Sequence, residues 1–291
     1  GGVVWPIDSR LSVGVSLAAQ GVGADYERAA LPVPGAGRLK SSLKVAEVIP
    51  TLAWRVTPDL AVGASLNLAY ARFEASGVIV PAPVPGGALA LPSHGAQSAS
   101  GAGLRLGALW KVAPTLAVGA NYKSRTHMGA LEGYRDDLLA YSDGRIDLPA
   151  QFGVGAAWTP MPALTLAADW LRVKYASTKV MQDPNGFGWK NQPVFRIGAA
   201  WAPDERLTLR AGASRNTSQI DADHVAPNVL APSIFDRAYT AGVSWQASPA
   251  SEFSASLEFN PRRTIVGTGP SSGIDSSAKA YFLYLGWQQR F

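Results

Sequence analysis

Few side chains in this chain are suited to covalent chemistry. The 291 residues include no Cys and only three His, namely His94, His127 and His224. No Gly-x-Ser-x-Gly motif and no closely spaced group of His and carboxylates accompanies them, although such patterns mark hydrolase nucleophiles and metal sites. We therefore expect neither enzymatic activity nor a cofactor, and no metal site.

Single charged residues, set among apolar ones, offer a different chemistry. The cations are Arg105, Lys123, Arg125, Arg196 and Arg210, with Glu47, Asp169 and Glu258 as partial counter-ions. Such cations could bind an anionic group such as a carboxylate, or they could simply pair with one another across a polar interior. The net charge of +5 does not indicate nucleic-acid binding, because the densest basic run is only Arg262-Arg263.

Strands must position these charges, because apolar and polar residues alternate along the chain. Between Leu60 and Phe73, one register holds Leu, Val and Tyr, and the other holds Gly, Ser, Asn and Ala. The last residues, Tyr281 to Phe291, form another alternating strand, with aromatic residues on one face. In these strands most charges fall opposite the Trp and Leu residues, as expected where a charge facing mid-bilayer lipid costs about 2 to 4 kcal/mol.

A turn motif repeats along the whole chain. A Trp is followed by a short turn that contains Pro and then by a new strand, at Trp5, Trp54, Trp110, Trp158, Trp201 and Trp245. Pro suits tight turns, since its φ is fixed and it has no N–H for a strand ladder. The intervening connections are longer and richer in Gly, Pro, Asp and Ser. Short turns at one end and long loops at the other are typical of outer-membrane barrels.

The predicted fold is an all-β, transmembrane, antiparallel up-and-down β-barrel of about twelve strands, forming a single domain over residues 1–291. The mean hydropathy of +0.05 fits this class, because the two faces of each strand average out. No segment approaches the roughly 18 apolar residues of a spanning helix. A soluble β-sandwich and a propeller are the weaker alternatives, since neither explains a Trp at every turn together with two long strands per repeat. The predicted location is the bacterial outer membrane.

Several segments in this order resemble the long-chain fatty acid transporter family of outer-membrane proteins (FadL/TodX type). The resemblance rests on residues 49–59, 62–73, 119–124, 148–155, 164–170, 196–201 and 207–212. It implies a fourteen-stranded barrel that is plugged by an N-terminal hatch and takes up long-chain fatty acids or aromatic and aliphatic hydrocarbons. No counterpart of the hatch or of the first two strands precedes Gly1, so we expect a fragment, a part supplied elsewhere, or a smaller barrel.

The resemblance also implies a lateral opening in the barrel wall. Residues 11–25 would correspond to a third strand that kinks inward, with Gln20, Gly21 and Gly23 at the opening. The alternative is an ordinary strand that runs into a Gly-rich loop.

One outer loop, residues 78–92, is almost wholly apolar, although it should face water and lipopolysaccharide. The resemblance implies that this loop and the next one form a landing groove for substrate, with the residues Ile79, Val84, Leu89, Leu91, Leu138 and Leu139. The alternative is a loop folded down over the barrel mouth.

Inside the barrel, the predicted ligand-binding residues combine cations with apolar neighbours suited to a fatty acid. They are Phe73, Arg105, Lys123, Arg125, Asp169, Arg196, Arg210, Phe282 and Tyr284. The predicted function is passive uptake of hydrophobic small molecules, and the alternatives are a structural or adhesive surface barrel and a general diffusion porin. The expected partners are the ligand, membrane lipid and lipopolysaccharide, with a monomer favoured. An outer-membrane phospholipase is not expected, because strand parity predicts that His127 points inward.

Overall fold

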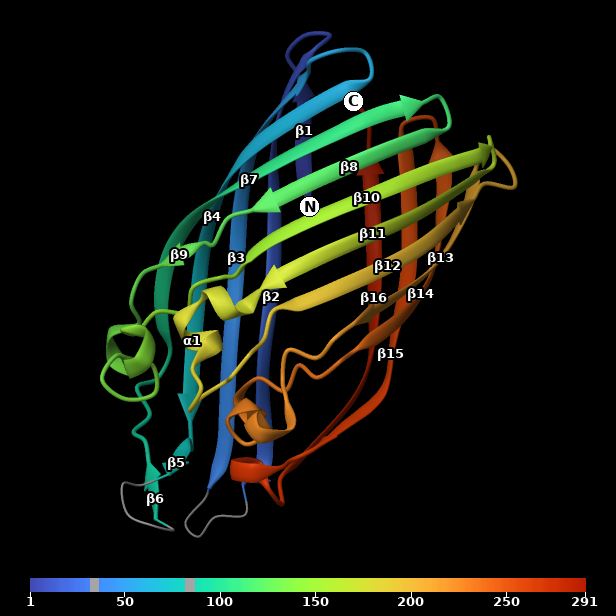
Figure 1. Ribbon diagram of the computed structural model, residues 1–291. Helices are drawn as coiled ribbons and strands as arrows, with labels where there is room; N and C mark the ends of the chain where they lie inside the picture. The colour runs from blue at the N-terminus through green and yellow to red at the C-terminus, as the bar shows by residue number, and fades with distance from the viewer. Residues whose placement is uncertain (32–36, 82–86) are drawn as a thin grey trace.

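Long antiparallel strands dominate the computed structural model, which describes residues 1–31, 37–81 and 87–291 (Figure 1). The strands are β1 (Gly2–Pro6), β2 (Leu11–Ala29), β3 (Arg38–Arg55), β4 (Leu60–Ser76), β5 (Ile79–Pro81), β6 (Ala88–Ala90), β7 (Gln97–Ala113), β8 (Leu116–Lys123), β9 (His127–Met128), β10 (Ala150–Met161), β11 (Leu164–Lys174), β12 (Gln192–Trp201), β13 (Leu207–Asn216), β14 (Arg237–Ser248), β15 (Ser251–Val266) and β16 (Asp275–Gln289). The helical segments are α1 (Lys179–Gln182) and the 3-10 turns η1 (Glu132–Tyr134), η2 (Ala140–Ser142), η3 (Tyr175–Ser177), η4 (Ala222–His224), η5 (Pro227–Leu230) and η6 (Gly269–Ser271). In these ranges, no helix has the length and apolar character needed to cross a membrane.

Fourteen strands form one sheet in which neighbours along the chain are neighbours in space. The order is β1-β2-β3-β4-β7-β8-β10-β11-β12-β13-β14-β15-β16, with β9 beside β7. From β2 to β16, twelve strands of this sheet have eight or more residues, as the sequence predicts. β1 and β16 lie at the two ends of the order, and no hydrogen-bonded pair joins them within the described residues.

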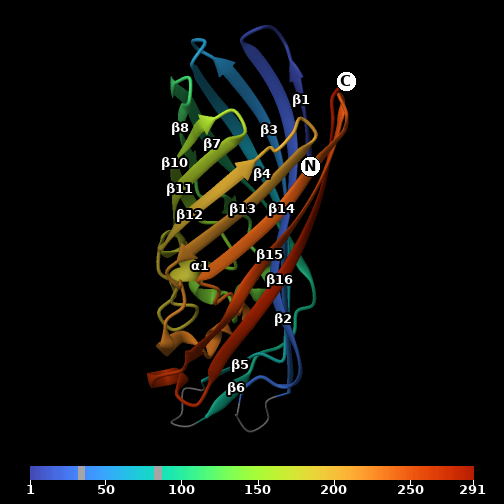
Figure 2. The same cartoon turned by 90° about the vertical axis from the view of Figure 1, so that its right-hand side faces the viewer.

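The two ends of the wall differ as predicted from the turn motif. Short turns gather at one end, and the longer connections with α1 gather at the other (Figures 1 and 2). In two of the short turns, an Asp carboxylate accepts two backbone N–H groups. Asp8 accepts from Arg10 and Leu11 at 2.6 and 2.7 Å, and Asp204 accepts from Arg206 and Leu207, both at 2.8 Å. These bonds satisfy the backbone where the strand ladder stops.

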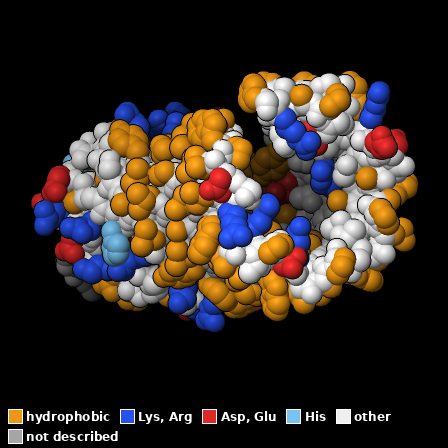
Figure 3. Space-filling view, turned by 90° about the horizontal axis from the view of Figure 1, so that it is seen from above, with side chains coloured by type: hydrophobic (Ala, Val, Ile, Leu, Met, Phe, Trp, Pro, Cys, Tyr) orange, Lys and Arg blue, Asp and Glu red, His pale blue; other side chains and the backbone are white. Residues whose placement is uncertain are grey.

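The strand registers place large apolar side chains on the outward face. Residues paired across antiparallel strands share a face, and Trp170 pairs with both Val154 and Phe195. Trp158 and Trp201 remain about half exposed, whereas the inward Glu47 is only 6% exposed. In Figure 3, apolar side chains cover much of the outer surface, and charged side chains show inside the hollow. The outside of this wall is therefore suited to lipid.

The loop end is closed by a packed apolar cluster, here called the outer cap. Its buried members are Phe73, Ala75, Val78, Leu131, Tyr134, Leu139, Ile146, Val180, Met181, Trp189, Ile220, Val225, Ala231, Ile234 and Ile265. They come from strands and loops all around the wall. The loop between β13 and β14 reaches across to β2 and β3, where its Val229 and Leu230 carbonyls accept hydrogen bonds from Tyr26 (3.1 Å) and Ser41 (2.5 Å).

Candidate functional site

One polar network, here called the Glu47 cluster, lies inside the wall formed by β3, β4, β7 and β8. Lys123 Nζ donates to Glu47 Oε1 at 2.7 Å, and Arg105 Nη2 donates to Oε2 at 3.0 Å. Asn67 Nδ2 donates to Glu47 Oε1 (2.7 Å) and to Thr126 Oγ1 (3.0 Å), while Asn67 Oδ1 accepts from Arg105 Nη2 at 2.6 Å. Glu47 is thus compensated by two cations although its side chain is almost fully buried.

This network limits the ability of Arg105 and Lys123 to bind a ligand. Both are engaged by Glu47, and the side chain of Lys123 is only 11% exposed. An incoming anion would have to compete with a buried carboxylate that is already in place. The Glu47 cluster is therefore better suited to holding four strands in register than to binding a ligand.

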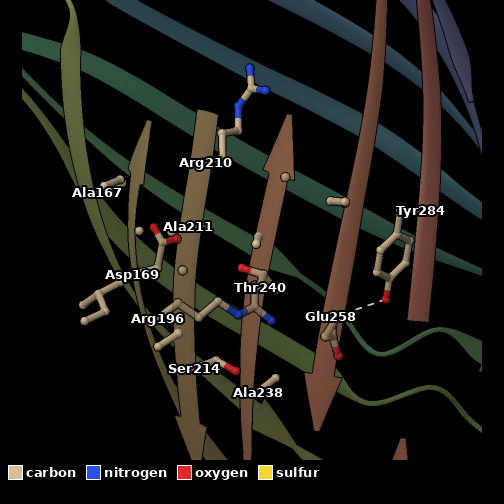
Figure 4. A pocket seen from close by; sticks show the side chains of 18 of the residues that line it. Ala167, Asp169, Arg196, Arg210, Ala211, Ser214, Ala238, Thr240, Glu258 and Tyr284 are labelled. Atoms are coloured by element: carbon tan, nitrogen blue, oxygen red, sulfur yellow. Dashed lines mark hydrogen bonds between the residues drawn. The ribbon is translucent and has the colours of Figure 1, made fainter. Parts of the chain in front are cut away.

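A second polar site is a cavity of about 1130 Å³ on the inner side of β11 to β16, here called the lumenal pocket. It brings together four of the predicted residues, Asp169, Arg196, Arg210 and Tyr284, with Glu258 (Figure 4). Tyr284 Oη donates to Glu258 Oε2 at 3.3 Å, and Asn260 Nδ2 donates to Glu258 Oε1 at 2.8 Å. Asp169 of β11 and Glu258 of β15 therefore lie on either side of the two arginines, which belong to β12 and β13.

The two arginines of the lumenal pocket are less committed than Arg105 and Lys123. Arg210 Nη1 donates to Ser244 Oγ. Arg196 lies opposite Asp169 in the strand register and extends toward Thr240 in Figure 4. Neither arginine forms an ion pair among the residues that the structure describes. Both guanidinium groups can therefore donate hydrogen bonds to an anionic group of a ligand.

Three other predicted ligand-binding residues lie elsewhere. Phe73 is buried in the outer cap, 4.9 Å from Tyr134 between ring centroids, and not in the lumenal pocket. Phe282 lies opposite Glu258 in the strand register, two residues from Tyr284. Arg125 was predicted to point into the barrel, and this is wrong. It lies on the outward side of the wall, because the alternation shifts between Lys123 and Thr126, which both point inward.

The same shift reverses the prediction for His127. This residue pairs with Ala102, which is on the outward face of β7 together with Leu104, and its side chain is 63% exposed. The next residue, Met128, points inward and is 3% exposed. His127 therefore faces outward and not inward.

The residues predicted for a lateral opening lie within β2. Gln20, Gly21 and Gly23 pair without interruption with Val45, Lys44 and Ser42 of β3. A Cβ at Gly23 would overlap the Ser41 carbonyl oxygen, so glycine permits a close approach of the two strands here. On its other edge, the backbone of β2 pairs with no strand beyond Leu17 among the described residues.

The residues predicted for an outer-loop groove separate into two groups. Leu139 is buried in the outer cap, and Leu91 and Leu138 pack against that cluster. Leu89 is 49% exposed and Ile79 is half-buried, in the small sheet formed by β5 and β6. Val84 lies outside the described residues. The loop region is thus largely folded over the mouth, with Leu89 exposed on it.

Sequence reasoning missed Asn67, Thr126 and Asn260, which organise the polar groups. Asn is depleted in strands, so its presence at position 67, on the inner face of a long strand, was the available signal. Thr126 gave no such signal, because its inward direction depends on the shift after Lys123.

The protein thus combines an antiparallel barrel wall, an apolar cap and a charged lumen, and known proteins share its fold. Residues 1–265 match the sequence profile of the family described as outer membrane protein transport protein (OMPP1/FadL/TodX). The chain belongs to this family. Members of the OMPP1/FadL/TodX family are outer-membrane transport proteins, so the bacterial outer membrane is its location.

Solved structures share the fold of this OMPP1/FadL/TodX family member. The Pseudomonas putida toluene transporter TodX matches with a TM-score of 0.75 and 19% identity, over 100% of this chain and 81% of that one. The Ralstonia pickettii toluene transporter TbuX gives 0.69 and 19%, over 100% and 80%. A Pseudomonas aeruginosa FadL homologue gives 0.65 and 15%, over 98% and 75%. No curated protein matches the chain significantly.

Proposed function

We propose that this protein moves hydrophobic small molecules passively across the outer membrane. The observation that carries the proposal is the outer cap, a packed apolar cluster at the mouth of a lumen whose inner wall is polar. A hydrophobic molecule can partition into such a cap, whereas a hydrated ion or sugar would lose its water there. Membership of a family of outer-membrane transport proteins supports the same proposal.

The proposed route starts at the exposed apolar side chains of the outer loops, including Leu89. It continues through the outer cap, and then either along the lumenal pocket or sideways through the wall at Gln20 to Gly23. The lateral branch rests on Gly21 and Gly23 of β2, because a strand bends or bulges most readily at glycine. Movement needs no energy source, because the ligand follows its concentration gradient.

The first test is to identify what the protein retains. The protein is purified in a detergent whose chains differ from natural acyl chains, extracted with organic solvent and analysed by mass spectrometry, beside an unrelated barrel. Stoichiometric enrichment of fatty acid or hydrocarbon supports the proposal. No enrichment, together with free conductance of small hydrophilic solutes, would instead favour a diffusion porin, and a blocked lumen without ligand would favour a surface scaffold.

The substrate class can be separated with the two arginines of the lumenal pocket. A fatty acid carboxylate gains a charge-assisted hydrogen bond from Arg196 or Arg210, whereas toluene gains none. Replacing both by Met should weaken fatty-acid binding about tenfold or more, on the basis of about 1.5 to 3 kcal/mol per charged hydrogen bond. Toluene uptake should be unchanged. Equal effects on both ligands would contradict a carboxylate site.

The lateral branch has its own test at Gly23. Gly23→Val places a branched side chain against the Ser41 carbonyl and should disturb the pairing of β2 with β3 at this point. Hydrophobic uptake should change in vesicles that contain folded protein. Gly63→Val is the matched control, because a Cβ at Gly63 would find no heavy atom closer than 3.4 Å. Identical uptake by both variants and the parent chain would count against lateral passage.

A further inference from the structure

The outer wall departs from regular strand geometry between β8 and β9. β8 ends at Lys123. β9 begins at His127 and lies beside β7, separated from the end of β8 by three residues (Figure 1). Ser124 N donates to Leu104 O at 2.8 Å, and Leu104 N donates to Ser124 Oγ, also at 2.8 Å. This irregular segment turns Arg125 and His127 to the outside of the wall.

The irregularity leaves a groove of about 650 Å³ on the outward face, here called the outer-wall groove. Its apolar part is lined by Leu66, Leu104 and Tyr122, and its polar part by Arg125, His127 and Lys174. The three apolar residues belong to the face that meets lipid, because Leu66 pairs with Leu104 and Leu106 pairs with Tyr122. The outer-wall groove therefore has an apolar part next to a basic part.

The basic part lies at the level of the outer headgroups. Lys174 is the last residue of β11, ten residues after Leu164 at the short turn. A strand rises about 3.3 Å per residue, and a tilt near 40° converts this to a height of about 25 Å. The apolar band of such barrels is also about 25 Å tall. The apolar part of the groove thus lies within the bilayer, and the cations lie at its outer boundary.

The charge of the outer-wall groove is positive and partly fixed in place. Asp147 Oδ2 lies 3.8 Å from both Arg125 Nε and His127 Nδ1, and Asp147 Oδ1 accepts from Met128 N at 2.9 Å. Arg125 Nη1 donates to the Ser177 carbonyl at 2.9 Å. Among the described residues, Lys174 has no carboxylate within ion-pairing distance. One acidic residue therefore faces two permanent cations and a histidine.

We propose that the outer-wall groove binds a phosphorylated lipid of the outer leaflet, the lipid A part of lipopolysaccharide. A sugar-linked phosphate lies between Arg125 and Lys174, and an acyl chain lies over Leu66, Leu104 and Tyr122. Two features of the groove select this partner. The cations require an anionic headgroup, and the apolar part below them requires a chain that enters the bilayer. This interaction is separate from the lumenal route proposed above.

The test compares binding of bisphosphorylated and enzymatically dephosphorylated lipid A to the full chain in detergent micelles, by native mass spectrometry. The unaltered protein should bind the bisphosphorylated form at least tenfold more tightly. Arg125→Ala and Lys174→Ala should each weaken binding about fivefold, since a basic residue near an anionic lipid surface contributes about a factor of five. The double variant should lose most of the phosphate preference, and added salt should weaken binding further in the unaltered protein.

The control removes the same charge at the opposite end of the wall. Arg55→Ala with Arg206→Ala deletes two exposed cations near the short turns and should bind lipid A like the unaltered protein. Folding of every variant is checked by its heat-dependent electrophoretic mobility. Equal affinity for the two lipids in the unaltered protein would overturn the proposal without reliance on any variant. So would undiminished phosphate preference in a folded double variant.

Discussion

At the scale of single residues, the lumen contains two kinds of cation. Arg105 and Lys123 are held by the buried Glu47, whereas Arg196 and Arg210 line an open cavity without ion pairs among the described residues. The sequence presents all four alike, as basic residues on the inner register of a strand. Their different roles follow from the burial of Glu47, because a buried carboxylate must be compensated while a cavity-facing guanidinium can remain solvated.

Glu47→Gln should destabilise the protein strongly. The substitution leaves Lys123 nearly buried without its counter-ion, and breaking such a pair costs about 3 kcal/mol, near the lower end of the usual range because Arg105 is partly exposed. Urea unfolding in lipid vesicles measures the loss. Lys123→Met in the same chain should restore part of it, and Asp59→Asn at an exposed turn serves as control. An unchanged midpoint would show that the network does not stabilise the wall.

At the scale of elements, the passage from β8 to β9 shows how one irregular segment reverses a face. Lys123 and Thr126 both point inward although three residues separate them, so strict alternation fails between them. The ladder is interrupted there, with Ser124 bonded to Leu104 by both its backbone and its side chain. A polar group at this point is satisfied locally, which allows the strand to shift phase at the outer boundary of the lipid.

Spin labels should detect this reversal directly. The chain has no Cys, so one introduced Cys reports by itself. A nitroxide at His127→Cys should be accessible to oxygen dissolved in the bilayer, because this side chain is exposed on the outward face. A nitroxide at Met128→Cys should be protected, because Met128 is buried against Val45 and Leu148. If power saturation instead showed the label at position 128 to be more accessible to oxygen than the label at position 127, side chains would alternate regularly here and the reversal would be contradicted.

The loop between β13 and β14 carries a second testable element, the contact between His224 and two neighbours. His224 Nδ1 lies 2.5 Å from Asp221 Oδ1, and Nε2 lies 3.0 Å from the Pro184 carbonyl of the loop after α1. Burial lowers the pKa of His224, but the hydrogen bonds to Asp221 and Pro184 and the nearby carboxylates outweigh it and raise the pKa above its ordinary value. Two acceptors require both ring nitrogens to be protonated.

This contact should make the loop more stable at low pH. Because the folded-state pKa of His224 is above the unfolded value of about 6.5, the stabilisation is fully present below that pH and is lost as pH rises through the folded-state pKa. Hydrogen exchange of residues 218–235, corrected for the intrinsic rate, should show weaker protection at about pH 8 than at about pH 5.5. His224→Gln should remove this difference, whereas His127→Gln should keep it. A difference that persists in His224→Gln would assign it to other groups.

At the scale of the whole molecule, the barrel combines a polar lumen with an apolar closure at one end. Loops from opposite sides of the wall meet in the outer cap, and Tyr134 lies at its centre, 1% exposed. Its hydroxyl accepts from Ala75 N at 3.0 Å and donates to the Gly95 carbonyl at 2.7 Å. The cap therefore covers the loop end of the barrel with packed apolar side chains.

Tyr134→Ala should open the cap and make the protein leaky to small ions. The substitution removes a buried aromatic ring and its hydrogen bonds to Ala75 in β4 and to Gly95 after β4, at a local cost of about 3 to 5 kcal/mol. Conductance in planar bilayers should rise several-fold above that of the parent chain. Tyr141→Ala, which truncates a side chain that is 52% exposed, is the matched control. Equal conductance of all three proteins would show that the barrier lies elsewhere.

The sequence by itself determined the strands, their number, the two faces, the two ends and the family. The family rests on the resemblance of particular segments, whereas the other features follow from a period of two and from Pro-containing turns, which are local properties of the backbone. The tertiary structure brought four of the residues predicted to bind ligand, Asp169, Arg196, Arg210 and Tyr284, into one pocket. The direction of Arg125 and His127, the engagement of Arg105 and Lys123 by Glu47, and the burial of Phe73 and Leu139 in the outer cap were decided by tertiary structure. They depend on a break in the ladder and on contacts between distant strands and loops, and local alternation contains no information about either.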